Sequence, residues 1–281
     1  MERFAGVPEE YSSYEKAKIV VLPVPYDATS TWVKGADKGP GALLDASVAL
    51  EWYDIETETQ VYKQGIFTAQ PVLENTTPEE LCHAVENRLK GLFQDNKFPV
   101  TIGGNHTVSI GAIRAAASQY EDLTVLQLDA HSDLRPVYEG SVLNHACVMY
   151  QASQLCPITQ VGIRSMCEEE LGLFKKDRIF YAHNIVGKKD WQEKALKTLS
   201  KNVYVTIDLD VFDPSVLPST GTPEPGGLSY YEVLYFLRSV FAQYNVVGFD
   251  VVELCPNEKE RASDFLAARL IYQLMTYQFL K

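Results

Sequence analysis

Residues 126–133 read Leu-Gln-Leu-Asp-Ala-His-Ser-Asp, and they join an apolar run to three polar side chains at alternate positions. The run 123–128 is typical of a buried strand, and Asp129, His131 and Asp133 follow it directly. Carboxylates at the exit of an apolar strand are costly to desolvate unless something compensates their charge, and a divalent cation commonly does so. The stretch therefore predicts a metal site just past a buried strand.

A second stretch has the same character. The apolar run 203–207 leads into Asp208 and Asp210, with Asp213 and Pro214 closing the turn. Taken alone, an Asp after a strand is more often a helix cap or turn residue, and a lone His is more often a hydrogen-bonded core residue. Two strand exits with paired acids, one of them with an intervening His, weaken that simpler interpretation.

Apolar runs alternate with helical patterns along the whole chain. Thr77-Pro78-Glu79-Glu80 is a typical helix start, and Ser229 with Glu232 forms a capping box. The expected strands are 18–22, 98–102, 123–128, 158–163, 178–182, 203–207 and 246–252, and the expected helices are 42–50, 78–92, 110–117, 190–200, 229–244 and 258–280. This order predicts one α/β domain over residues 1–281, with three αβα layers and a mainly parallel central sheet.

Seven polar residues are expected at the carboxyl ends of these strands, where ligands bind in open parallel sheets. They are His106, Asp129, His131, Asp133, Asp208, Asp210 and Glu253. Two His and four Asp exceed the needs of one divalent ion and suit a pair such as two Mn²⁺. Four carboxylates balance the charge of two such ions, so a bridging hydroxide leaves one negative charge, which favours a cationic substrate. Because a metal pair makes hydroxide available near neutral pH, hydrolysis is the expected reaction.

The amino-acid composition and the net charge limit the classes of molecule that the protein is expected to bind. The 281 residues are 46% hydrophobic and carry a formal net charge of −12, which argues against nucleic-acid or anionic-membrane partners. The start of the chain has no signal-peptide pattern and no apolar run is long enough to span a membrane, so we expect a soluble, cytoplasmic protein. The five cysteines include no C-x-x-C pair and are expected to be reduced, mostly buried thiols.

These motifs together resemble the ureohydrolase (arginase and agmatinase) family, and within it the chain is most similar to agmatinases. The resemblance covers nearly the whole sequence. The motifs that resemble the family are residues 24–27 with the later Gly39-Pro40, residues 103–107, residues 129–133, residues 208–210, and the run Thr-Pro-Glu-Pro-Gly-Gly at residues 222–227. That last run, and Tyr138-Glu139-Gly140 before His145, point to agmatinases rather than arginases.

The resemblance implies an enzyme that hydrolyses the guanidinium group of agmatine to putrescine and urea, in polyamine metabolism, by a hydroxide bridging two Mn²⁺ ions per subunit. It also implies a homo-oligomer, either a trimer or a hexamer. By motif position Asp129 and Asp208 would bridge the ions, with His106 and Asp133 completing one shell and His131 and Asp210 the other.

The resemblance also assigns the remaining site residues. His145 is similar to the family's proton shuttle to the departing amine, and Glu253 to the carboxylate that pairs with the guanidinium; with Asp133 they form the expected catalytic set. From the residues alone, His145 is equally a surface loop residue and Glu253 a first-turn helix acid. Glu224 either contacts substrate or only shapes a proline turn.

One departure concerns the family's Gly-Gly-Asp-His-Ser turn, because this chain has Asn105 and Thr107. If the usual Asp supports a metal ligand, Asn105 weakens manganese binding, since loss of such a partner costs about 10 to 100-fold. Leu134-Arg135-Pro136 is also found in the formimidoylglutamate-hydrolysing branch.

Other substrates remain open, namely guanidinobutyrate, arginine and formimidoylglutamate. A carboxylate-ended substrate would use Arg135, the one obvious basic residue near the site motifs. A regulatory protein that binds metal or polyamine without catalysis, and a purely structural α/β protein, are the alternatives from other classes. The structural alternative leaves six strand-end ligands unexplained.

Overall fold

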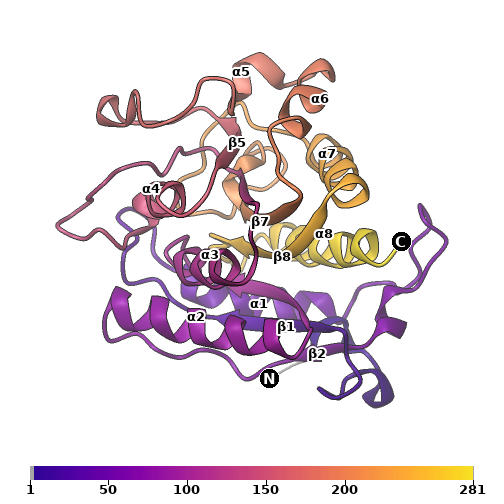
Figure 1. Ribbon diagram of the computed structural model, residues 1–281. Helices are drawn as coiled ribbons and strands as arrows, with labels where there is room; N and C mark the ends of the chain where they lie inside the picture. The colour runs from indigo at the N-terminus through magenta and orange to yellow at the C-terminus, as the bar shows by residue number, and fades with distance from the viewer. Residues whose placement is uncertain (1–2, 281) are drawn as a thin grey trace.

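The computed structural model describes residues 3–280, and at its centre lies an eight-stranded sheet whose paired strands run parallel (Figure 1). The strand order is β2-β1-β3-β8-β7-β4-β5-β6. The strands are β1 (Ile19–Val24), β2 (Ile66–Thr68), β3 (Phe98–Gly103), β4 (Leu123–Leu128), β5 (Ile158–Ile163), β6 (Ile179–Tyr181), β7 (Asn202–Asp208) and β8 (Asn245–Val252). The parallel α/β sheet predicted from the sequence is confirmed.

Helices cover both faces of the sheet. They are α1 (Gly39–Ser47), α2 (Pro78–Gln94), α3 (Val108–Gln119), α4 (Val148–Ser153), α5 (Ala182–Ile185), α6 (Asp190–Leu196), α7 (Tyr230–Gln243) and α8 (Ala262–Gln278). Helices α1 and α5 to α8 pack on one face, and α2 to α4 pack on the other, where α2 and α3 lie side by side (Figure 1). The predicted three-layer αβα arrangement is therefore also confirmed.

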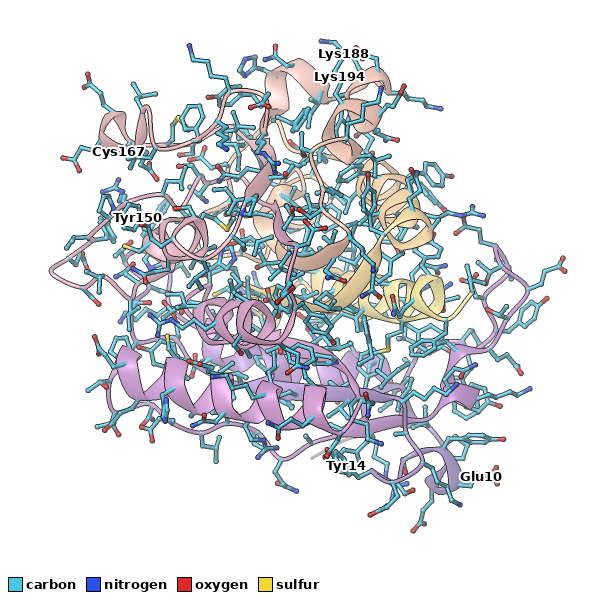
Figure 2. All side chains as sticks on the ribbon, in the orientation of Figure 1. Glu10, Tyr14, Tyr150, Cys167, Lys188 and Lys194 are labelled. Atoms are coloured by element: carbon cyan, nitrogen blue, oxygen red, sulfur yellow. The ribbon has the colours of Figure 1, made fainter. Side chains whose placement is uncertain are left out.

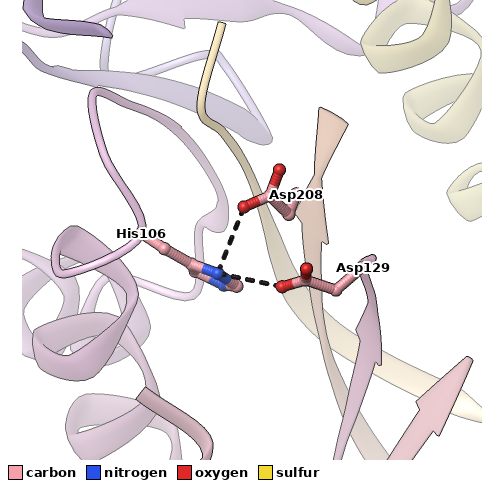
Figure 3. Close-up of side chains that lie close together, drawn as sticks. All are labelled: His106, Asp129 and Asp208. Carbon is pink, nitrogen blue, oxygen red and sulfur yellow. Dashed lines mark ion pairs between the residues drawn. The ribbon is translucent and has the colours of Figure 1, made fainter. Parts of the chain in front are cut away.

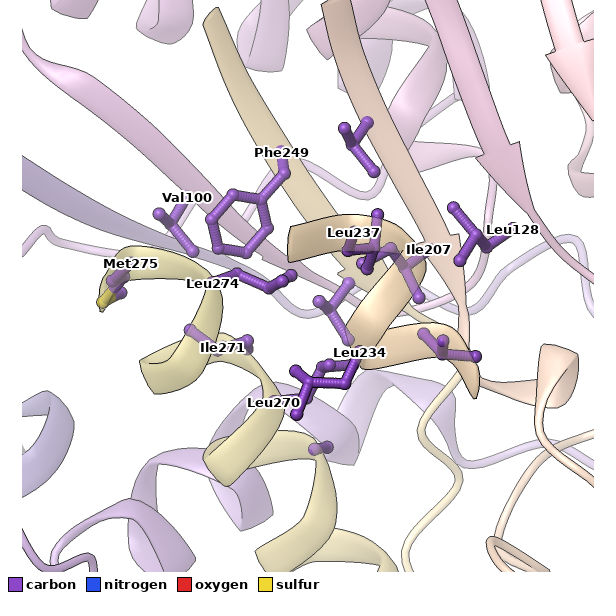
Figure 4. Packing of buried hydrophobic residues seen from close by; sticks show 14 of the residues in the cluster. Val100, Leu128, Ile207, Leu234, Leu237, Phe249, Leu270, Ile271, Leu274 and Met275 are labelled. Atoms are coloured by element: carbon purple, nitrogen blue, oxygen red, sulfur yellow. The ribbon is translucent and has the colours of Figure 1, made fainter. Parts of the chain in front are cut away.

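The strands of the sheet contribute to two hydrophobic clusters, one on each face. In β1, Ile19 and Val21 belong to the cluster under α8, whereas Val20 and Leu22 belong to the cluster under α2 and α3. Figure 4 shows the first cluster, in which strand residues such as Phe249 lie against residues of α7 and α8. Burial on both faces explains why the strands read as nearly continuous apolar runs in the sequence.

Both predicted helix starts are present. Thr77 caps α2 by accepting a hydrogen bond on Oγ1 from the backbone N–H of Glu80 at 3.1 Å. At α7 the backbone N–H of Glu232 donates to Ser229 Oγ at 3.4 Å, and Glu232 Oε2 accepts from the backbone N–H of Ser229 at 2.9 Å. These caps satisfy backbone donors that the first helical turn leaves unpaired.

Some elements differ from the sequence-based expectation. The three-residue strand β2 was not predicted, and neither were the short helices α4 and α5. The last helix begins at Ala262 rather than at 258, and the Glu260 side chain satisfies a first-turn donor by accepting the backbone N–H of Ser263 on Oε1 at 3.0 Å. Helices of four to six residues span too few turns to show a helical period in the sequence.

The outer helices carry charged side chains into solvent. Figure 2 shows Lys188 and Lys194 pointing outward at the α5–α6 end of the molecule. In α6, Lys194 lies 3.5 Å from Asp190, an exposed pair of a kind that contributes about 0.3–0.5 kcal/mol. All five cysteines are free thiols, and among residues 3–280 no helix combines the length and apolar character needed to cross a membrane.

Candidate metal centre

The candidate site lies over the middle of the sheet, where β3, β8, β7 and β4 are neighbours. These strands are followed at their carboxyl ends by His106, Glu253, Asp208 and Asp129 respectively, with Asp208 as the last residue of β7. Residues up to 147 positions apart in the sequence therefore lie in contact. The backbone N–H of His106, for example, donates a hydrogen bond to Glu253 Oε1 at 2.6 Å. This is the edge at which open parallel sheets bind ligands.

The first group of side chains surrounds His106. Its Nδ1 lies 2.9 Å from Asp133 Oδ2, 3.2 Å from Asp129 Oδ2 and 3.5 Å from Asp208 Oδ2, and Figure 3 shows the last two carboxylates on one side of the ring. The Nδ1 atom is buried yet makes no hydrogen bond within the described residues. A buried imidazole nitrogen facing three carboxylate oxygens in this way fits a metal ligand.

The second group surrounds His131. Its Nδ1 lies 2.8 Å from Asp210 Oδ2 and 3.7 Å from Asp129 Oδ1. Asp129 therefore belongs to both groups, with one oxygen toward each His. Ligand atoms of Asp129, His131 and Asp210 lie close enough together to hold one ion, and those of His106, Asp129 and Asp208 to hold another.

The loops that carry these acids also use them as turn residues. Asp129 Oδ1 accepts the backbone N–H of His131 at 2.6 Å, and Asp208 Oδ1 accepts that of Asp210 at 2.9 Å. Asp210 Oδ1 accepts the backbone N–H of Ala130 at 2.9 Å, which joins the two loops. The turn interpretation therefore applies, and it is compatible with the predicted ligand role, because each Asp has a second oxygen that faces a histidine.

The electrostatics show an excess of negative charge. Burial, then repulsion from Asp129, raises the pKa of Asp133 to about 7. Burial and the neighbouring Asp210 and Asp129 raise the pKa of Asp208 well above its usual value. Burial would lower the pKa of His131, but Asp210 and Asp129 outweigh it and raise that pKa to about 12. Buried carboxylates that raise the pKa of their neighbours in this way fit a site where a divalent cation compensates the negative charge.

His145 and Glu253 face the same pocket as His106, His131 and Asp133. The His145 ring lies edge-on to Tyr138 with the centroids 5.8 Å apart, and burial lowers the pKa of His145 to about 4. Burial raises the pKa of Glu253 to about 8. The pocket thus contains a neutral imidazole and a carboxyl group beside the two histidine groups.

Glu224 lies at the edge of the site. Its Oε1 is 3.9 Å from His131 Nε2, and its backbone carbonyl accepts a hydrogen bond from the Arg164 guanidinium at 2.8 Å. The same guanidinium nitrogen donates to the Asp210 carbonyl at 2.6 Å. The contacts of the Glu224 backbone carbonyl fit the turn interpretation, and a contact of Glu224 with substrate stays a prediction. Arg164 was missed in the sequence, because its only signal there is a basic residue one position past the β5 strand.

Asn105 does not contact a ligand side chain through its hydrogen bonds in the described chain. Its Nδ2 donates to Thr29 Oγ1 at 2.7 Å and to Ser30 Oγ at 3.3 Å, and its Oδ1 accepts the Thr107 backbone N–H at 3.3 Å. These hydrogen bonds give no direct support to a ligand side chain, and the expected effect of Asn105 on manganese binding stays a prediction. Its amide instead anchors the loop 29–33, and that loop was another missed part of the site, since residues 30–33 line the pocket.

Glu170 is a further missed residue. It is buried, and its Oε1 accepts hydrogen bonds from Ser132 Oγ at 2.6 Å and from the Leu134 backbone N–H at 2.7 Å. It thereby holds the loop that carries His131 and Asp133. Its only sequence signal, a run of three glutamates at 168–170, is that of a solvated surface segment.

A three-layer α/β fold with carboxylate and imidazole ligands at the strand ends defines a class of metal-dependent hydrolases. Residues 17–277 match the family model described as Arginase family, and the chain belongs to this family. It is a ureohydrolase, and enzymes of this family use a binuclear metal centre.

Relatives and solved structures agree with this assignment. The chain is 40% identical to the N(1)-aminopropylagmatine ureohydrolase of Synechocystis sp. over 96% of this chain and 92% of that protein. It is 34% identical to the agmatinase of Halalkalibacterium halodurans over 87% of this chain and 86% of that protein. The crystal structure of agmatine ureohydrolase of Thermoplasma volcanium superposes with a TM-score of 0.89 at 30% identity, covering 100% of this chain and 95% of that one.

Proposed function

We propose that the protein hydrolyses the terminal guanidinium group of agmatine, or of agmatine extended by an aminopropyl group, to urea and the corresponding amine. One observation carries the proposal, namely that two groups of His and Asp side chains share Asp129 at the floor of a pocket. The excess negative charge of the acids supports a cationic substrate as well as a pair of cations.

Two Mn²⁺ ions are the proposed cofactors, because the donors are carboxylate oxygens and imidazole nitrogens rather than thiolates. In this proposal Asp129 and Asp208 contribute to both ions. His106 and Asp133 complete one set of ligands, and His131 and Asp210 complete the other. When bound, such an ion pair supplies a hydroxide nucleophile near neutral pH.

Glu253 is proposed to orient the guanidinium. A planar guanidinium presents parallel N–H donors, and a carboxylate accepts two of them in one plane. One Glu253 oxygen already accepts the His106 backbone N–H at 2.6 Å, which holds the carboxyl group in place beside the histidine groups.

His145 is proposed to deliver the proton to the departing amine. At neutral pH its ring is uncharged, because burial lowers its pKa to about 4, so one ring nitrogen carries a proton and the other can accept one. Its Nδ1 is buried without a hydrogen bond, so no protein contact competes for that atom in the described chain. Glu224, 3.9 Å from His131 Nε2, is proposed to contact the substrate at the edge of the site.

The far end of the substrate would lie along the pocket mouth. Trp32 is 75% exposed there and lines the pocket together with Val33 and Tyr138. An exposed indole offers an apolar surface to methylene groups and a π face to an ammonium group. The higher identity to an N(1)-aminopropylagmatine ureohydrolase, 40% against 34% for an agmatinase, favours the longer of the two substrates.

A carboxylate-ended substrate would need a cation at the same place. Arg135 lines the pocket, and its guanidinium carbon lies 4.5 Å from the centre of the Tyr138 ring. The alternatives guanidinobutyrate, arginine and formimidoylglutamate are therefore included in the test. The family resemblance also leads us to propose a cytoplasmic homo-oligomer, a trimer or a hexamer, which light scattering on the purified protein would test.

The test is urea or formamide release from manganese-reconstituted protein with each of these five compounds. We expect the highest kcat/KM with aminopropylagmatine or agmatine and no product from Asp129→Ala, which removes the residue shared by both groups. A preference for a carboxylate-ended compound would move the assignment to another amidinohydrolase. No product from any compound, with two manganese ions bound per chain, would refute the proposed function.

A further inference from the structure

Behind His106, on the side away from the carboxylates, lies a buried polar chain that the reaction described above does not use. His106 Nε2 is 2.8 Å from Thr206 Oγ1, and Thr206 Oγ1 donates to Asp250 Oδ1 at 2.7 Å. All three side chains are at most 1% exposed. A fully buried carboxylate in the centre of a sheet is costly, so its retention needs a physical reason.

Asp250 accepts hydrogen bonds from two further hydroxyl groups. Ser109 Oγ donates to Asp250 Oδ1 at 2.9 Å, and the Tyr204 hydroxyl donates to Asp250 Oδ2 at 2.8 Å. Within the described residues its hydrogen-bond partners are thus three hydroxyls, from β7 and from the first turn of α3. No Lys or Arg pairs with it there. Three donors converging on two oxygens fit an ionised carboxylate, which can only accept.

The direction of the chain of hydrogen bonds follows from this arrangement. Each hydroxyl has a single hydrogen, and that of Thr206 points toward Asp250 Oδ1 at 2.7 Å and Ser109 Oγ at 3.3 Å, with the carboxylate the nearer acceptor. Thr206 can therefore offer only a lone pair to His106, so the hydrogen must be on Nε2. The lone pair of His106 is then on Nδ1, the atom that faces Asp129, Asp133 and Asp208 at 2.9 to 3.5 Å.

We propose that Thr206 and Asp250 are positioning residues that fix the ring orientation and tautomer of His106 for metal binding. The proposal rests on the proposed function, because it requires His106 to bind one of the ions. Thr206 and Asp250 are direct partners in the register of β7 and β8, so the sheet itself holds the pair in place. A ligand imidazole whose other nitrogen donates into such a partner is both oriented and made more basic.

The experiment compares manganese affinity among variants of this chain of contacts, measured by calorimetric titration of the metal-free protein. Thr206→Val is nearly isosteric and removes the acceptor of His106 Nε2, and Asp250→Asn replaces an obligate acceptor by a group that also donates. We expect about 10 to 100-fold weaker binding of one manganese ion per chain in both variants. Thr206→Ser, which keeps the hydroxyl, should restore the parent affinity.

Tyr204→Phe is the matched control for a merely structural role. It removes a hydroxyl from the same buried carboxylate but leaves the link from His106 through Thr206 to Asp250 intact. If the network only stabilises the core, Tyr204→Phe and Thr206→Val will lower the Tm of the metal-free protein alike and leave both manganese affinities unchanged, and the inference is refuted. We expect instead that only Thr206→Val and Asp250→Asn weaken one ion.

The same titration separates this inference from the proposed function. If the parent protein binds two manganese ions and releases urea while Thr206→Val binds both ions as tightly, the positioning role fails and the function stands. If the parent binds no manganese, both fail. If Thr206→Val does not fold, the manganese affinities of Asp250→Asn and Tyr204→Phe are compared instead. Both of these variants keep the Thr206 hydroxyl.

Discussion

Each carboxylate oxygen of Asp129 has its own neighbours. Oδ1 accepts the His131 backbone N–H at 2.6 Å, and Oδ2 accepts the Gln127 side-chain amide at 2.7 Å and faces His106 Nδ1 at 3.2 Å. Asp210 lies in only one of the two groups, with Oδ2 at 2.8 Å from His131. The two aspartates therefore have different expected roles in a binuclear site.

This difference predicts a difference in stoichiometry. We expect Asp210→Asn to retain about one manganese ion per chain after gel filtration and Asp129→Asn to retain neither, since a neutral amide is a poorer ligand than a carboxylate. Metal content measured by mass spectrometry against protein concentration reports this directly. Equal manganese content in the two variants would argue against Asp129 as the shared ligand.

Asn105 gives a second prediction at this scale. Its amide bonds to the hydroxyls of Thr29 and Ser30, which can rotate to donate to a carboxylate instead. We therefore expect Asn105→Asp to change manganese affinity far less than the about 10 to 100-fold typical for losing a partner of a metal ligand. Calorimetric titration measures the affinity. A large change would show that position 105 supports the metal site.

Trp32 gives a third prediction at the scale of single residues. Its exposed indole at the pocket mouth is expected to contribute about 0.5–1 kcal/mol to holding an ammonium group, which corresponds to a rise in KM of about two- to five-fold in Trp32→Ala. The kcat should stay near that of the parent, because the ring lies away from the reacting group. Trp32→Phe, which keeps an aromatic face, is the control. A fall in kcat with unchanged KM would place Trp32 in a different role.

At the scale of elements, the segment from Asp213 to Leu228 joins β7 to α7 and carries Glu224. Asp213 Oδ2 accepts the backbone N–H groups of Gly226 at 2.8 Å and Gly227 at 3.1 Å, which closes this segment into a loop. Gly227 has no room for a Cβ atom, because one would lie 2.5 Å from the Asp213 nitrogen. The Thr-Pro-Glu-Pro-Gly-Gly motif therefore has a structural reason besides substrate binding.

The loop closure gives a pH prediction. Hydrogen bonds from Ser215 and from Gly226 and Gly227 lower the pKa of Asp213 from 3.8 to about 2. Because the folded pKa is the lower one, the stabilisation is fully present above pH 3.8 and is lost as pH falls toward 2. We expect Asp213→Asn to lower the urea midpoint at pH 6, with the difference from the parent shrinking between pH 4 and 2.

The control for this prediction is Asp190→Asn, at an exposed position on α6. It should leave the urea midpoint near that of the parent at every pH, because surface ion pairs contribute little. If the Asp213→Asn difference does not depend on pH in the acid range, the carboxylate charge is not what closes the loop.

Across the whole molecule, the sequence predicted what depends on local pattern. The long apolar runs located seven of the eight strands, and because parallel strands end at one edge, the acids after β4 and β7 could be expected to meet. The position of β8 between β3 and β7 could not be predicted, because strand order depends on pairings between distant segments. The same holds for Arg164, Glu170 and the loop 29–33, whose roles consist of long-range contacts.

The metal site also makes a prediction for the stability of the whole molecule. The four acids Asp129, Asp133, Asp208 and Asp210 are 0–7% exposed, so their mutual repulsion is poorly screened by solvent. Each manganese ion that binds only the folded protein, at a free concentration of about 100 times its dissociation constant, adds about 2.7 kcal/mol, or about 5 °C in Tm for a chain of this length.

Calorimetry with and without Mn²⁺ measures this shift, and an equal concentration of Na⁺ salt controls for ionic strength. Removal of the metal with a chelator should return Tm to its starting value. In Asp129→Ala, which lacks the residue shared by both groups, we expect manganese to add little to the Tm of the metal-free variant. A variant that is stabilised by manganese as much as the parent would show that the ions bind elsewhere on this acidic protein.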